Sequence, residues 1–213
     1  MHTIESYIPA LRYRWLTPLY DPLVTRFMHE EVFKERLITQ AGLKPGMHLL
    51  DVGCGTGTLA LMIKRAYPQV EVSGLDADPE ILKLACKKAT HADLDITFDQ
   101  GMAYSLPYKK NYFDRVVSSM VMHHLTREDK TKTFREIHRV LRLEGELHLV
   151  DFGSPSNIYM RLSSMVLRRF EEVEDNINGK LIEFIHSAGF ALAIQTGHYD
   201  TLFGTLTFYK AIK

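Results

Sequence analysis

Several features that usually narrow a protein's class are missing from this sequence. The chain has only two cysteines, Cys54 and Cys86, and their spacing matches neither a disulfide framework nor a metal site. Its 26 basic residues balance 26 acidic ones, so no net charge directs it toward nucleic acid. It has no apolar run near the ~20 residues of a membrane-spanning helix, and its start lacks a signal-peptide layout. These absences predict a cytoplasmic protein with reduced thiols, no metal and no nucleic-acid partner.

The stretch from Leu49 to Leu61 is the most informative part of the chain. A strand-like apolar run ends at Asp51 and Val52, and a helix-like apolar pattern begins near Thr58. Between them lie three alternating glycines: Gly53, Gly55 and Gly57. Because glycine has no Cβ atom, the backbone of this turn can approach a ligand closely. The start of the helix adds amide groups and the positive end of its dipole, so the turn is expected to bind an adenosine-containing cofactor.

The positions of the glycines distinguish two cofactor classes. A dinucleotide-binding turn has glycine at its first, third and sixth positions, but here the sixth position is Thr58. The pattern Asp-Val-Gly-Cys-Gly-Thr-Gly, residues 51–57, instead resembles motif I of the class I S-adenosylmethionine (SAM) methyltransferases. This resemblance implies that six residues line a SAM site: Asp51, Gly53, Cys54, Gly55, Thr56 and Gly57.

A second acid supports the same site. The run from Val70 to Leu75 is typical of a strand and leads into Asp76, about twenty residues beyond the glycine turn, where a carboxylate can bind both ribose hydroxyls. Ala77 follows in the same loop. Asp78 and Pro79 are expected to begin a helix as its N-cap and first residue. Asp76 is therefore predicted to bind the cofactor and Asp78 to have a structural role.

Strand-like and helix-like segments alternate from about residue 47 to 152, which predicts a parallel sheet with helices on both faces. Strands are expected at 47–52, 70–76, 95–99, 113–119, 145–151, 190–196 and 206–211. Helices are expected at 58–67, 79–90, 127–141 and 176–188. The last two strands flank a short turn with Gly204 and should form an antiparallel hairpin. Such a hairpin is typical of class I methyltransferases, so the expected fold is a Rossmann-like α/β sheet of order 3-2-1-4-5-7-6.

Further segments extend the resemblance over roughly residues 20–213. The chain is similar to the UbiE-like small-molecule methyltransferases, which include enzymes that act on quinone precursors and some phospholipids. Beyond motif I, four segments match that group: residues 72–76, 99–108, 113–125 and 139–153. The shared segments imply SAM as cofactor and S-adenosylhomocysteine as product.

Met102 is the main departure from the family pattern. The family usually has an acid there, after the glycine that is Gly101 in this chain, and the acid binds the adenine amine. The resemblance still implies adenine contact by Gly101, Met102 and Ala103, with backbone groups reading the base edge. Binding is expected to be weaker by the ~1–3 kcal/mol of a charge-assisted bond, unless Asp99 or Gln100 compensates.

The candidate catalytic residues follow the fourth and fifth strands. Methyl transfer from SAM is an in-line displacement in which positioning contributes ~7–11 kcal/mol, and a base is needed only when the acceptor must lose a proton. His123 or His124 is the candidate base, and a structural role of the pair is the open alternative. Asp151 is the third candidate, with orientation of its loop as the alternative. Ser118 and Ser119 end the fourth strand and are expected at the cofactor.

Two helical segments are expected to cover the site of this single domain. The parts are an N-terminal lid (1–40), a SAM-binding core (41–153), a lid insertion (154–175), and a C-terminal helix with hairpin (176–213). In the first lid, Tyr20 resembles a family tyrosine that reaches the methionyl end of the cofactor. Asn157–Phe170 in the second is amphipathic and basic, so it covers the acceptor or contacts a membrane surface. These apolar lids favour a lipid-like acceptor.

Three functional hypotheses follow from the sequence. The first is a SAM-dependent methyltransferase acting on a small or lipid-like apolar acceptor. The second is a non-catalytic SAM-binding protein with a regulatory or assembly role, for which only Met102 argues. The third is a NAD-dependent oxidoreductase, against which Thr58 and the terminal hairpin argue. The sequence identifies neither the acceptor and its methylated atom nor the oligomeric state.

Overall fold

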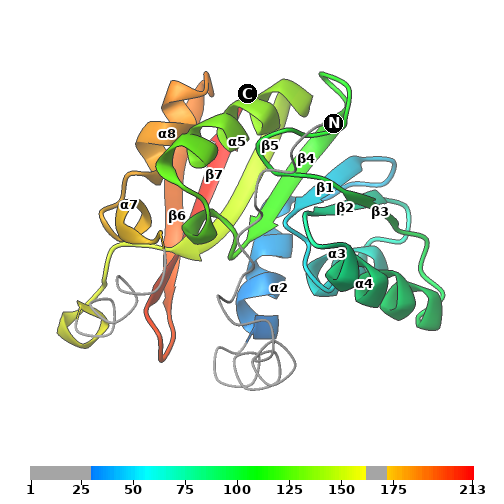
Figure 1. The fold of residues 1–213 in the computed structure, drawn as a ribbon, viewed down its shortest axis with the longest axis horizontal. Coiled ribbons are helices and arrows are strands. Elements are labelled where there is room, and N and C mark those ends of the chain that lie inside the picture. Colours follow the sequence, from blue (N-terminus) through cyan, green and yellow to red (C-terminus); the bar gives the residue numbers. More distant parts are fainter. Residues whose placement is uncertain (1–29, 162–171) are drawn as a thin grey trace, which may run out of the picture.

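Seven strands form one sheet in the order β3-β2-β1-β4-β5-β7-β6 in the computed structural model, which describes residues 30–161 and 172–213 (Figure 1). The strands are β1 (His48–Val52), β2 (Glu71–Asp76), β3 (Thr97–Gln100), β4 (Phe113–Ser119), β5 (Leu141–Phe152), β6 (Leu192–Asp200) and β7 (Thr205–Ile212). The first five strands, β1 to β5, all run parallel to their neighbours among them. β7 runs antiparallel to both β5 and β6. The predicted order and the terminal hairpin are confirmed.

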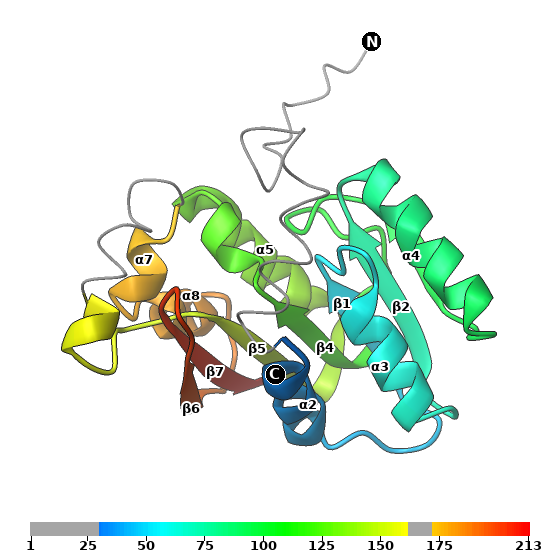
Figure 2. The same ribbon diagram turned by 90° about the horizontal axis from the view of Figure 1, so that it is seen from below.

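Helices cover both faces of this sheet (Figure 2). They are α2 (Glu30–Ala41), α3 (Thr58–Ala66), α4 (Pro79–His91), α5 (Arg127–Val140), α7 (Glu174–Ile177) and α8 (Leu181–Ser187), with a short 3-10 helix η2 (Met122–His124). Buried side chains of α2 and α3 belong to one core, and those of α5 and α8 to the other. The helices of each pair therefore lie on the same face of the sheet.

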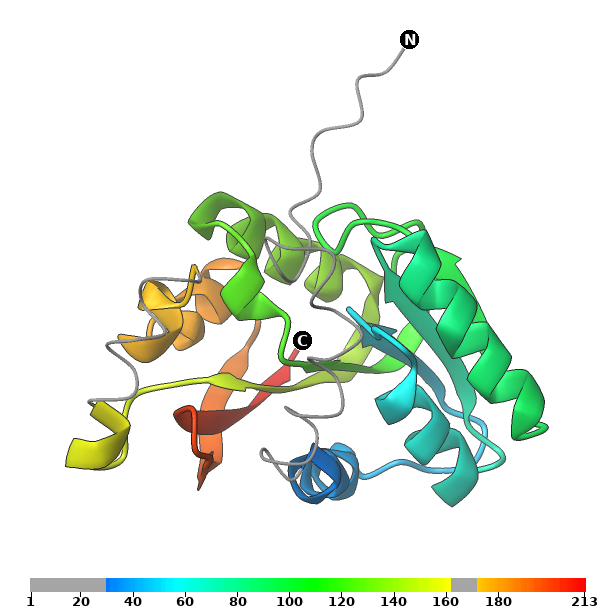
Figure 3. The ribbon, with the colours of Figure 1, turned by 60° about the horizontal axis from the view of Figure 1, so that its bottom comes forward.

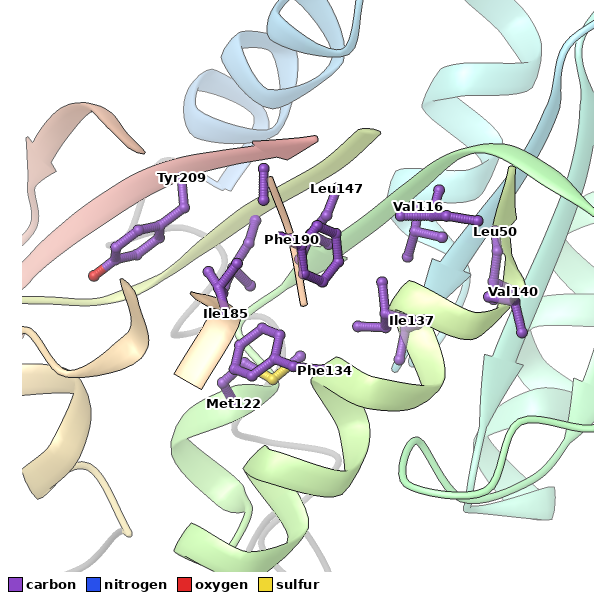
Figure 4. Close-up of a cluster of buried hydrophobic side chains, with 14 of the residues drawn as sticks. Leu50, Val116, Met122, Phe134, Ile137, Val140, Leu147, Ile185, Phe190 and Tyr209 are labelled. Atoms are coloured by element: carbon purple, nitrogen blue, oxygen red, sulfur yellow. The ribbon is translucent and has the colours of Figure 1, made fainter. Parts of the chain in front are cut away.

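Successive residues of the central strands point into different cores. Leu49 packs on the α2 side, and its neighbour Leu50 packs on the α5 side. Figure 4 shows this second core, where Phe134 and Ile137 of α5 and Ile185 of α8 lie against the sheet. Both faces of the sheet are thus buried, which explains why the strands read as continuous apolar runs rather than as alternating patterns.

Two element boundaries differ from the sequence-based expectation for identifiable reasons. The single helix expected at 176–188 is two helices, because Gly179 adopts a φ of 74° and ends α7 before α8 begins. The fifth strand begins at Leu141, four residues early, and includes an irregular stretch in which Glu144 has a φ of 61°. The N-terminus of α4 agrees with expectation, since the Asp78 side chain accepts a hydrogen bond from the Glu80 amide and Pro79 follows the cap.

Part of the segment expected as an N-terminal lid belongs to the core. α2 packs against β5 and β4 through Phe33, Leu37 and Ile38 and lies on a sheet face in Figure 3. Residues 1–29, including Tyr20, and residues 162–171 of the second lid segment lie outside the described residues. Within the described ranges, no helix has the length and apolar character needed to cross a membrane.

Candidate functional site

The predicted site residues collect at one edge of the sheet, where the parallel strands end. Asp51 and Asp76 lie at the ends of β1 and β2, and Ser119 and Asp151 lie at the ends of β4 and β5. The strands are paired directly, with Asp51 opposite Val117 and Ser119 opposite Val150. Ligands of open α/β sheets bind at this edge, so the arrangement is that of a ligand site.

The three glycines of the turn after β1 serve different purposes. A Cβ atom on Gly53 would lie 2.3 Å from Cγ2 of Val121, and one on Gly57 would lie 3.0 Å from Cζ of Phe98. The absence of a side chain at Gly53 therefore lets the loop after β4 pack closely against the turn. The absence of one at Gly57 lets side chains of the core pack there. A Cβ atom on Gly55 would meet nothing within 4 Å. Only Gly55 leaves open space for a ligand.

Hydrogen bonds hold the turn against the end of β2. The amides of Gly53 and Cys54 both donate to the Leu75 carbonyl, at 2.8 and 3.0 Å, and the Gly55 amide donates to Asp76 Oδ2 at 2.9 Å. In the structure these three amides fix the shape of the turn, so they are not available to a ligand. The expectation that amides face a ligand concerned the start of the helix near Thr58 and stays a prediction.

Two backbone amides fix the orientation of the Asp76 carboxylate. Its Oδ2 atom accepts from Gly55, and its Oδ1 atom accepts from the Asp78 amide at 3.0 Å. Each carboxylate oxygen can accept a further bond, and the side chain is partly exposed. The carbonyl of the adjacent Ala77 accepts from Gln100 Nε2 at 3.3 Å. Asp76 therefore ends β2 as expected, and its role at a ribose stays a prediction.

Asp51 is a buried carboxylate with an unpaired oxygen. It is 1% exposed, and its Oδ2 atom has no hydrogen-bond partner among the described residues. Burial raises its pKa to about 7, against the lowering effect of the nearby ammonium group of Lys34. The hydroxyl of Ser119 is likewise buried and unpaired among these residues. Buried unpaired groups mark sites where a ligand or ordered water belongs, and an acid with a hydroxyl fits the amino-acid end of SAM.

Other predicted cofactor residues are engaged by the protein. Ser118 Oγ donates to the Val52 carbonyl at 2.9 Å, and Thr56 Oγ1 accepts from Lys88 Nζ at 2.7 Å. Cys54 is buried, and burial raises the pKa of its thiol far above the ordinary value. It therefore acts as a small turn residue and not as a nucleophile. Across the described part of the chain, no group of three or more His, Cys, Asp or Glu could hold a metal ion.

Asp99 and Gln100, the two residues that could replace the missing adenine-binding acid at Met102, lie at the end of β3. The Gly101 amide donates to the Asp76 carbonyl at 3.0 Å, which places this loop beside the ribose acid. Asp99 accepts from the Tyr108 hydroxyl at 2.9 Å, and Gln100 is bound to the loop after β2. Both candidate substitutes thus interact elsewhere, while Met102 and Ala103 are half-buried at the sheet edge.

His123 and Asp151 form a buried pair. His123 is 4% exposed, and its Nδ1 atom lies 2.8 Å from Asp151 Oδ1. A carboxylate only accepts, so Nδ1 is the donor and the neutral ring keeps Nε2 as an acceptor. His124 is half-buried, and its ring lies 3.9 Å from that of His123. Sequence reasoning treated the two histidines equally, and the structure adds that His123 is the more buried one and is bound to Asp151.

Asp151 organises the loop that carries the histidines. Its Oδ2 atom accepts from the Val121 and Met122 amides at 3.0 and 2.7 Å, and Oδ1 accepts from the Phe152 amide at 2.7 Å. Burial alone would raise its pKa, but the nearby histidines and these donors hold the pKa below the ordinary value. With His123 also bound, the carboxylate has little capacity left for a substrate.

Sequence reasoning missed three buried polar residues near the site. Lys34 is buried in α2 beside Asp51, and Lys130 is buried in α5. Asn176 in α7 donates to Asp151 Oδ1 at 3.1 Å. The lysines had a detectable signal, since each lies on the apolar stripe of an amphipathic helix. Asn176 had none, because nothing in the sequence relates it to the end of β5.

Comparisons with known proteins agree with this geometry. A family model described as a methyltransferase domain matches residues 49–145. The chain is 31% identical over 152 residues to a 2-phytyl-1,4-naphtoquinone methyltransferase of Nostoc sp., a match that covers 68% of this chain and 65% of that protein. It is 32% identical over 149 residues to an uncharacterized methyltransferase of Synechocystis sp., covering 70% of this chain and 68% of that one. The chain thus spans just under two thirds of the Nostoc protein.

A comparison with solved structures finds the same fold. The crystal structure of the YcgJ protein from Bacillus subtilis superposes with a TM-score of 0.68 at 19% sequence identity, covering 84% of this chain and 97% of that one. At this identity the likeness concerns the fold alone, and the sequence matches carry the family assignment. The chain belongs to the class I SAM-dependent methyltransferases, in the UbiE-like group of small-molecule enzymes.

Proposed function

We propose that the chain transfers the methyl group of SAM to a small, lipid-like acceptor. The observation that carries this proposal is the edge formed by the end of β1, the open turn at Gly55 and the fixed carboxylate of Asp76. Asp76 would bind the ribose, and Asp51 with Ser119 and Lys34 would hold the amino-acid end. SAM, when bound, supplies a methyl group on a positively charged sulfur.

The acceptor class is proposed from two observations. The Nostoc relative is named for a phytyl naphthoquinone, an apolar ring with a long hydrocarbon tail. In this chain, large apolar side chains stay exposed beyond the end of β5, where such an acceptor would approach. We therefore expect a quinol-type acceptor and propose His123 as the group that takes its proton. Asp151 would act as a positioning residue for His123.

A methyl-transfer assay with a matched pair of variants tests this proposal. A naphthoquinol is incubated with SAM, and methylated product is followed by mass spectrometry. Asp76→Ala removes two charge-assisted bonds to the ribose and is expected to lower kcat/KM by ~100-fold. Asp78→Ala, two residues away, removes only a helix cap worth ~1 kcal/mol, and its kcat/KM is expected to stay within about threefold of the native value. Equal losses in both variants would contradict the assigned pocket, whereas cofactor binding with no turnover of any acceptor would support the non-catalytic alternative.

We further propose that the edge of the molecule near the acceptor site contacts a membrane surface. Four large apolar side chains are exposed there: Ile158, Tyr159, Leu202 and Phe203. Ser156 Oγ donates to Asp200 Oδ1 at 2.8 Å, which joins the segment after β5 to the β6–β7 turn. The four side chains therefore project from two connected segments, a helical turn after β5 and the β6–β7 turn, an arrangement that suits shallow insertion among lipid headgroups.

Co-sedimentation with vesicles of phosphatidylcholine and phosphatidylglycerol tests this contact. Replacing Ile158 and Tyr159, which are 74% and 55% exposed, with serine is expected to weaken vesicle binding about tenfold or more, because burial of one such side chain contributes ~1.5–3 kcal/mol. Leu143→Ser is the control, since Leu143 is 82% exposed near the start of β5, at the opposite edge. Native protein that stays in the supernatant, or equal losses in both variants, would refute the contact.

A further inference from the structure

Asn176 is a fully buried side chain whose role the sequence pattern does not indicate. It is 0% exposed in α7, and its Nδ2 atom donates to Asp151 Oδ1. The orientation of the carboxamide follows from chemistry, because only its nitrogen can donate to a carboxylate. Its Oδ1 atom has no hydrogen-bond partner among the described residues. The side chain thus directs its one assigned bond to the carboxylate that holds His123.

Packing alone does not account for an asparagine at this position. A leucine has the same number of side-chain heavy atoms and would leave no buried polar atom, whereas the carbonyl oxygen of asparagine has no donor among the described residues. An oxygen that loses its bonds to water and gains none from these residues destabilises the fold. Choices that are costly for stability are expected mainly at functional sites. The carboxamide of Asn176 is therefore better explained by what it does to Asp151.

α7 is attached to the histidine loop independently of Asn176. Lys130 Nζ donates to the Glu172 carbonyl, just before α7, at 2.6 Å. The guanidinium of Arg127 binds both carboxylate oxygens of Asp175. Arg127 and Lys130 lie in the first turn of α5, which follows η2 closely. Removal of the Asn176 carboxamide would leave these attachments in place, so its effect on the site can be measured separately.

We propose that Asn176 is a positioning residue of the methyl-transfer site, an inference that rests on the proposed role of His123. Its amide group fixes Asp151 Oδ1, the same atom that accepts the Nδ1 proton of His123. With Oδ1 fixed, the imidazole that donates to it from Nδ1 is held in one orientation, which directs Nε2 away from Asp151. Partners of this kind set the tautomer and ring orientation of functional histidines.

The variant Asn176→Leu in the full chain tests the proposal. We expect kcat to fall about tenfold, with unchanged KM for the acceptor and unchanged affinity for S-adenosylhomocysteine, since outer partners of functional histidines contribute at least that factor. Nitrogen-15 NMR of the histidine side chains gives a second readout that needs no acceptor. The His123 signal, assigned with the His123→Gln variant, is expected to shift and broaden in Asn176→Leu, because the ring is then held less firmly in one orientation, while Nδ1 stays protonated in both chains.

Glu174→Gln is the matched control, because Glu174 is an exposed side chain of the same helix. We expect kcat and the His123 signal of this variant to equal those of the native chain. An Asn176→Leu variant that changes only the unfolding temperature, with kcat and the His123 signal unaltered, would overturn the proposal. If the native chain methylates no acceptor but the His123 signal still changes, the proposed function fails while the positioning role of Asn176 stands.

Discussion

Replacing Asp51 with asparagine is expected to stabilise the ligand-free protein and to destroy its affinity for the cofactor. Burial raises the pKa of this carboxyl from its ordinary value of 3.8 to about 7. At pH 8 the native state must hold an ionised group that the unfolded state ionises far more easily. Asparagine removes that cost, so the free energy of unfolding at pH 8 should rise by about 2–4 kcal/mol.

The pH dependence gives this prediction its sign. A carboxyl whose pKa is raised on folding binds more protons in the native state, so the stability of the native chain falls as pH rises from about 4 to about 7. The advantage of Asp51→Asn should therefore be largest above pH 7 and should shrink toward pH 4. Cofactor affinity should fall ~100-fold or more, because asparagine carries no negative charge to pair with the ammonium group of the cofactor's amino-acid end.

Thermal unfolding at pH 5 and pH 8 measures the first effect, and calorimetric titration with S-adenosylhomocysteine measures the second. At pH 8 the unfolding temperature is expected to rise by roughly 5–15 °C. Asp95→Asn serves as control, since Asp95 is exposed and a surface change of this kind should alter stability by no more than ~0.5 kcal/mol. An Asp51→Asn variant that is less stable than the native chain at pH 8, or binds the cofactor normally, would contradict the account.

The second large effect is expected at His123. The variant His123→Gln retains a side-chain donor for Asp151 but no group that can take a proton at neutral pH. We expect kcat to fall ~10²–10⁴-fold, the usual contribution of a general base, while S-adenosylhomocysteine affinity stays unchanged. His124→Gln is expected to lower kcat less than tenfold, because His123, hydrogen-bonded to Asp151, is the proposed base.

Single-turnover measurements with excess enzyme distinguish the two histidines, because they report the chemical step and not product release. The unfolding temperature of each variant controls for loss of the fold. Full activity in His123→Gln with strong loss in His124→Gln would transfer the role of base to His124. Full activity in both variants would mean that methyl transfer here needs positioning alone.

The sheet order was predictable because two strong local signals agree. The glycine-rich turn after Asp51 marks the first strand and its helix, and the short turn at Gly204 predicts the closing hairpin. Boundaries were less predictable where a single backbone conformation decides them. The break between α7 and α8 depends on Gly179, which has a φ of 74°. The sequence does not indicate that a glycine among helix-forming residues adopts this conformation.

The candidate site was predictable only where function and local pattern coincide. Asp51 and Asp76 end strands that the sequence marks clearly, and both lie at the expected edge. The purpose of Gly53 was not predictable, since it depends on contact with Val121 from a distant loop. Asn176 was missed for the same reason, because its bond to Asp151 exists only after folding brings α7 to the end of β5.

Thermal unfolding of the native chain with separate ligands tests the central claim most directly. S-adenosylhomocysteine at ~100 times its dissociation constant should raise the free energy of unfolding by about 2.7 kcal/mol, and NAD and NADP at equal concentrations should have no effect. Stabilisation by S-adenosylhomocysteine alone is the result the account predicts. Stabilisation by NAD but not by S-adenosylhomocysteine would contradict it.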